Sequence, residues 1–96
     1  MTEMSSRVRR RVLADFGPQG DSMADRIERV IASAPMAERQ DQERLHAAVV
    51  LAADGSIEEF ETQLALAMID WRDLLLNAGL ANFDYPARLD AEFGPA

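Results

Sequence analysis

Seven apolar residues between positions 57 and 78 recur at alternating steps of three and four. This spacing places side chains on one face of an α-helix. We call them the seam: Ile57, Phe60, Leu64, Ala67, Trp71, Leu74 and Ala78. Such a face must be buried against the rest of the chain or against a second copy. The seam therefore predicts a packed helical protein, with Trp71 in the core, and it names no chemistry.

The composition predicts one small globular domain over residues 1–96, with a mobile N-terminus at 1–5. The hydrophobic fraction of 48% is typical of a folded chain of this length. The sequence has no cysteine, which excludes disulfides, thiolate metal sites and thiol catalysis. No stretch reaches the roughly 20 apolar residues of a membrane span. Asp15, Gly17, Pro18 and Gln19 follow Arg9-Arg10-Arg11-Val12-Leu13 and interrupt the apolar region that an export signal needs, so we expect a cytoplasmic protein.

The formal net charge of −7 is unevenly distributed along the chain. Residues 1–48 hold eight acids and eight arginines and are neutral in sum, whereas residues 49–96 hold nine acids and two arginines and carry all of the −7. An acidic surface repels nucleic acids and anionic membranes. We therefore expect that the C-terminal half binds neither nucleic acid nor a membrane.

Turn and capping residues divide the chain into about five helices. Gly17-Pro18-Gln19-Gly20 ends the first, Asp54-Gly55 ends the third, and Ser56 with Glu59 forms a capping box before the fourth. Almost every residue from 45 to 53 is apolar, which indicates a buried, central helix. The expected helices cover residues 6–16, 22–34, 41–53, 57–78 and 86–93.

The fourth helix could be continuous or broken near Asp70. The unbroken seam favours one helix, whereas Asp70 and Asp73 could cap a new helix that begins at Trp71. A helix of 22 residues would be about 33 Å long, which is long for a domain of this size. We therefore favour the break.

The only basic cluster is Arg7, Arg9, Arg10 and Arg11. One hypothesis is an arm that contacts phosphates or an acidic partner, in which Arg7, Arg10 and Arg11 would be contact residues. The alternative is a solvated helix face that pairs with the acidic half of the same chain. Four arginines without interleaved aromatic residues are a weak nucleic-acid signature, so we favour the alternative.

Glu43 and His46 form an E-x-x-H pair on one helical face, the spacing of di-iron helical bundles. Such bundles need the pair twice, and here it occurs once, so a metal site would require a second copy of the chain. We expect no cofactor and no metal, and His46 is more simply explained as part of a helix flank.

Asp70-Trp71-Arg72-Asp73 is the most distinctive polar cluster. Asp70, Arg72 and Asp73 could grip a partner, although a local capping and ion-pairing role is favoured. The stretch from Ala67 to Ala81, with residues 45–56 before it, resembles a family of small bacterial helical proteins of unknown activity. Members of that family end in an A-x-x-D-[WY]-R-D-[LV]-L-x-A-[GE] motif. The resemblance implies no site residue, and it favours a break near Asp70.

These observations predict an all-α domain with the other helices packed around helix 45–53. Catalytic motifs such as the P-loop and G-x-S-x-G are absent from the sequence. The favoured function is a non-catalytic protein-interaction module that forms a homodimer. The alternatives are a small nucleic-acid-associated regulator that uses Arg7–Arg11 and a metal-dependent protein with Glu43 and His46 paired across an oligomer.

Overall fold

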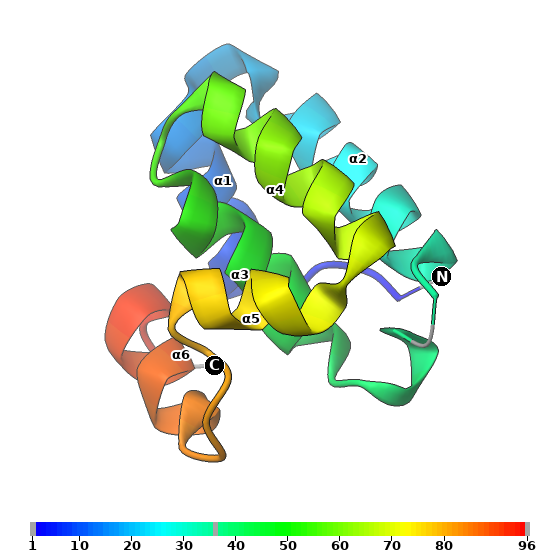
Figure 1. Ribbon diagram of the computed structural model, residues 1–96. Helices are drawn as coiled ribbons and strands as arrows, with labels where there is room; N and C mark the ends of the chain where they lie inside the picture. Colours follow the sequence, from blue (N-terminus) through cyan, green and yellow to red (C-terminus); the bar gives the residue numbers. More distant parts are fainter. Residues whose placement is uncertain (1, 36, 96) are drawn as a thin grey trace.

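The protein is an all-α domain, as predicted. The computed structural model describes residues 2–35 and 37–95, and within them the chain forms six α-helices, two short 3₁₀ helices and no strand (Figure 1). The elements are α1 (Ser6–Phe16), η1 (Gly17–Gln19), α2 (Gly20–Ser33), η2 (Ala37–Arg39), α3 (Gln42–Ala53), α4 (Ile57–Ile69), α5 (Trp71–Ala78) and α6 (Tyr85–Phe93). None of these helices combines the length and the apolar content that crossing a bilayer requires.

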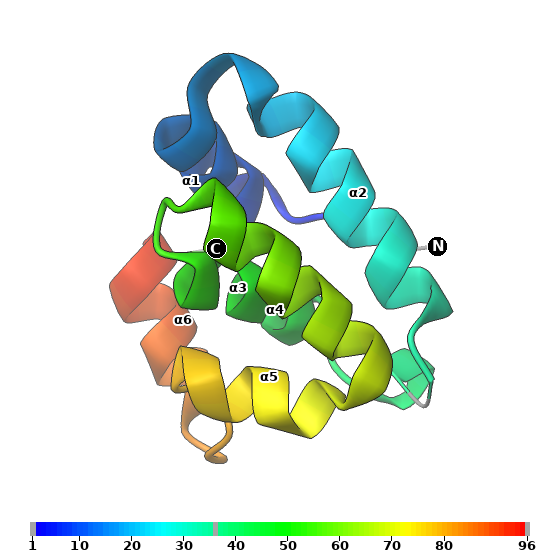
Figure 2. The ribbon, with the colours of Figure 1, turned by 45° about the horizontal axis from the view of Figure 1, so that its top comes forward.

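Helix α3 is the centre of the fold, which confirms the prediction for residues 45–53. Asp41 caps it, since its side-chain oxygen accepts a hydrogen bond from the backbone N–H of Glu43 at 3.0 Å. The residues of α3 from Leu45 to Val50 are buried, and the helix contacts α1, α2, α4, α5 and α6. Figures 1 and 2 show the other helices arranged around it. One hydrophobic core therefore surrounds α3.

The break at Asp70 is confirmed, and it divides the predicted fourth helix into α4 and α5. Asp70 adopts an extended backbone conformation (φ −156°, ψ 99°), and its carboxylate accepts a hydrogen bond from the backbone N–H of Arg72 at 3.0 Å. A residue that is not helical but satisfies an N–H of the next helix is an N-cap. The chain therefore turns a corner between α4 and α5, which is visible in both ribbon views.

The chain buries most of the seam itself, because α4 and α5 both pack against α3. Five seam residues are buried: Phe60, Leu64, Ala67, Leu74 and Ala78. Ile57 is 52% exposed, and Trp71 is only partly buried, in contrast to the prediction that it lies in the core. Most of the seam is therefore buried within one chain, and only Ile57 and part of Trp71 are left for contact with a second copy.

The start of the chain is attached to the core at two points. Met4 is buried, and its backbone N–H donates a hydrogen bond to the buried carboxylate of Glu28. The hydroxyl of Ser5 donates to Glu43 at 2.6 Å. The mobility expected for residues 1–5 stays a prediction, and Met1 lies outside the described residues.

Candidate partner-binding surface

Arg7 is the centre of an internal ion-pair network rather than part of an exposed arm. Its guanidinium donates to both carboxylate oxygens of Glu43 at 2.8 and 2.9 Å, to Asp90 at 2.6 Å and to the carbonyl of Gly94 at 2.7 Å. This Arg7 network joins α1, α3 and the end of α6. The hydrogen bonds from Arg7 lower the pKa of Glu43. Arg7 is 8% exposed and its guanidinium is occupied within the chain, so a contact between Arg7 and a partner stays a prediction.

The neighbouring arginines also pair with acids of the same chain. Arg9 bonds to Asp21 and Asp25 at 3.1 and 3.2 Å. Arg11 bonds to Asp15 at 3.2 Å, and its guanidinium lies 5.6 Å from the centre of the Phe93 ring. Within the described residues, only Arg10 of this cluster is exposed and makes no ion pair. One free arginine offers little to a phosphate backbone, so the geometry does not favour the nucleic-acid hypothesis.

Glu43 and His46 are not placed so that they could bind a metal together with a second copy of the chain. Glu43 is occupied by Arg7 and Ser5, and His46 is 1% exposed, so it cannot reach a second copy. Among residues 2–35 and 37–95, no three potential metal ligands come together. The geometry therefore gives no support to metal binding across an oligomer.

His46 is instead a buried side chain whose two ring nitrogens have no hydrogen-bond partner in the described protein. Burial lowers its pKa below the ordinary value of 6.5, and the nearby carboxylates of Glu28, Glu43 and Asp41 offset this only in part. The neutral imidazole is therefore the form that the fold accommodates.

The burial of His46 predicts that the free energy of unfolding falls as the pH is lowered from about 7 to 5. The unfolded chain takes up the histidine proton near pH 6.5 and the folded chain only at lower pH. The stability contributed by the neutral side chain is thus complete above pH 6.5 and is lost toward the folded pKa. Its slope is at most about 1.4 kcal/mol per pH unit. Urea unfolding of the wild type and of His46→Leu at pH 5, 6 and 7 measures this slope. If the free energy of unfolding changed equally with pH in both proteins, the pH dependence would not come from His46.

The Asp70–Asp73 cluster caps the start of α5 through Asp70, and the side chains of Arg72 and Asp73 lie in solvent. Asp70 caps the helix, and the Nε atom of Arg72 lies 3.8 Å from the Asp70 carboxylate. The guanidinium of Arg72 lies 5.6 Å from the centre of the Trp71 ring, yet its side chain is 77% exposed. Asp73 is also exposed. Arg72 and Asp73 therefore remain candidates for partner contact.

A hollow of about 380 Å³ lies beside α5, and we call it the α5 groove. Its lining is formed by Gln40, Arg44, Trp71, Arg72, Leu75, Leu76 and Ala81. Its volume lies within the range of about 300–1,000 Å³ that is typical of ligand pockets. The groove thus combines apolar side chains with two guanidinium groups.

Arg44 is held rigidly at this groove. Its Nε atom donates to the carbonyl of Leu80 at 2.9 Å, and its guanidinium stacks 4.1 Å from the centre of the Tyr85 ring. A cation fixed by a hydrogen bond and an aromatic face loses little side-chain entropy when it pairs with an anion. The α5 groove therefore favours an apolar group that is accompanied by a carboxylate.

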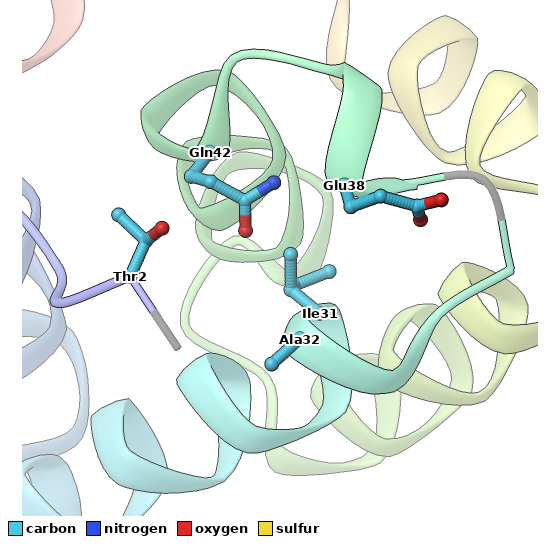
Figure 3. A pocket seen from close by; sticks show the side chains of 5 residues that line it. All are labelled: Thr2, Ile31, Ala32, Glu38 and Gln42. Carbon is cyan, nitrogen blue, oxygen red and sulfur yellow. The ribbon is translucent and has the colours of Figure 1, made fainter.

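A second hollow, of about 190 Å³, lies between the end of α2 and the start of α3 (Figure 3). Thr2, Ile31, Ala32, Glu38 and Gln42 line it. The Gln42 amide is already used, since it donates to the carbonyls of Ala37 and Gln40. The hollow is smaller than typical ligand pockets and leaves few polar groups free, so the α5 groove is the better candidate site.

Large exposed apolar side chains are most frequent in one stretch of the sequence, and one of them lines the α5 groove. In the described part of the chain, four of the six lie between residues 68 and 83: Met68, Ile69, Leu76 and Phe83, whereas Leu13 and Ile57 lie elsewhere. Leu76 lines the α5 groove, and Ile69 directly precedes the Asp70 cap, whereas Met68 lines a separate hollow formed by α2 and α4. Such a concentration of exposed apolar side chains is typical of an interaction surface.

Sequence reasoning identified Arg72 but not Gln40, Arg44, Leu76 or Phe83. The run Leu74-Leu75-Leu76 conceals which leucine faces outward, and only the packing of α5 on α3 decides it. Comparisons with models of protein families, with curated proteins and with solved structures find no match for this chain. The family resemblance drawn from the Asp70–Asp73 motif therefore stays a prediction.

Proposed function

We propose that this protein is a non-catalytic protein-interaction module that forms a homodimer through the surface around α5. The observation that carries the proposal is the exposure of Ile69, next to the cap of α5, and of Leu76, which lines the α5 groove. Leaving Ile69 81% exposed and Leu76 65% exposed is unfavourable in water, and burial against a second copy would remove this penalty.

The charges on this surface suit a two-fold interface. In such a dimer the same patch occurs on both subunits, so each patch must carry groups that complement itself. Arg72 lies between Asp70 and Asp73 in the sequence, and all three belong to the first turn of α5 or its cap. The arginine of one copy could therefore face a carboxylate of the other. The cytoplasmic location remains a prediction beside this proposal.

Light scattering of the purified protein at low and high salt tests the proposal. We expect a dimer that persists at high salt, because apolar contacts are screened little by ions. Ile69→Gln should weaken dimerisation by about tenfold or more, since the interface loses a buried isoleucine.

Ile57→Gln is the matched control. It makes the same change at a half-exposed isoleucine at the opposite end of α4, so the dimer should persist. A wild type that is monomeric at every concentration, or equal weakening by the two variants, would refute the proposed surface.

A further inference from the structure

Phe83 is the most exposed of the large apolar side chains in the described chain, at 96%. It lies in the turn between α5 and α6, which projects at the lower edge of the molecule in both ribbon views, in orange (Figures 1 and 2). The Phe83 side chain is almost completely outside the core of its own chain. We call this exposed side chain the knob. An exposed aromatic side chain is a common anchor of protein interfaces.

The α5 groove lies next to this knob on the same chain. Ala81 lines the groove and precedes Phe83 by two residues, so their Cα atoms are at most about 7 Å apart. Phe83 cannot fill the groove of its own chain, because nearly all of its surface is in solvent. A knob beside a groove makes a self-complementary patch, in which the knob of each copy can enter the groove of the other across a two-fold axis.

The groove and the turn are complementary in chemistry. The lining offers Leu75, Leu76 and the half-buried Trp71 to an aromatic ring. Its volume of about 380 Å³ leaves room for a benzyl side chain.

The charges also match. Asp84 follows Phe83, is exposed and makes no capping hydrogen bond through its side chain. The guanidinium groups of Arg44 and Arg72 lie at the groove, where the carboxylate next to an inserted Phe83 would find a cation.

We propose that the chain forms a two-fold dimer in which Phe83 of each copy inserts into the α5 groove of the other, while Asp84 pairs with Arg72 there. This inference rests on the self-association proposed above and names the contact that carries it. The occupant of the groove is thus a second copy of this chain, whose Phe83-Asp84 turn supplies both the apolar group and the carboxylate.

Phe83→Ala tests the insertion. Sedimentation or light scattering over a dilution series should show the dimer weakened by at least about thirtyfold, as for a central aromatic anchor. Leu13→Ala is the control, because Leu13 is a partly exposed apolar residue of α1 outside this surface, and it should leave the dimer intact. Circular dichroism should show both variants folded, since Phe83 contributes almost nothing to the core.

A charge exchange tests the pairing. Asp84→Arg and Arg72→Asp should each weaken the dimer, and the double variant should recover at least part of the loss. A wild-type monomer would overturn this inference together with the proposed function. A wild-type dimer that Phe83→Ala leaves unchanged would overturn the inference alone, and self-association through other residues of the surface would stand.

Discussion

Replacing Phe60 with alanine is expected to lower the free energy of unfolding by about 3–5 kcal/mol, the range for truncating a fully buried aromatic side chain. Phe60 is 0% exposed and meets Phe16 edge to face, with ring centroids 5.7 Å apart. The guanidinium of Arg26 lies 5.4 Å from its ring centre. The substitution therefore leaves a cavity in the core and removes the contacts of the Phe60 ring with Phe16 and Arg26. Urea unfolding followed by circular dichroism measures the loss.

Ile57→Ala is the control for this experiment, because it truncates an apolar residue of the same helix that is half exposed. We expect a loss below about 1 kcal/mol, since the isoleucine buries little surface. A domain of this length has a total stability of about 5–14 kcal/mol, so Phe60→Ala should unfold at markedly lower urea. Similar losses in the two variants would contradict the assignment of Phe60 to the core.

The helices and the core could be predicted from the sequence because their signals are local. The capping residues Ser56, Asp70 and Gly79 mark the ends of α4 and α5 within one turn of the residues they serve. The heptad spacing continues across the break at Asp70 because α4 and α5 both pack apolar side chains against α3. Periodicity alone therefore could not show that two helices share the seam, nor that Trp71 lies at its edge.

The partners of the arginines were only partly predictable, because they are distant in the sequence. Arg7 and Arg10 look equivalent in the N-terminal cluster, yet Arg7 pairs with Asp90, 83 residues away. The interpretation that the cluster pairs with the acidic half of the same chain fits the pairs Arg7–Asp90 and Arg11–Glu92. Arg9 instead pairs with Asp21 and Asp25 in the N-terminal half. The α5 groove was beyond prediction for the same reason, since Gln40, Arg44 and Ala81 meet only through the packing of α3 and α5.

Arg7→Met is expected to destabilise the protein by about 2 kcal/mol. Removing one partner of a buried ion pair typically costs about 3–5 kcal/mol because the other charge is left unpaired. The loss here should be smaller, since Asp90 is 63% exposed and water can replace its bond to Arg7. Glu43 is only 24% exposed, so it supplies most of the penalty. Arg10→Met on the same helix is the control, and it should change little because Arg10 is exposed.

The pH dependence separates this ion pair from mere packing of the arginine stem. Because Arg7 lowers the pKa of Glu43, the pair contributes stability that is present above the ordinary pKa of 4.5 and is lost as the pH falls through the folded pKa. The difference between wild type and Arg7→Met should therefore shrink below about pH 4.5. A difference that stays constant from pH 7 to pH 3 would mean that the methylene groups of Arg7, rather than its charge, hold α1 against α3 and α6.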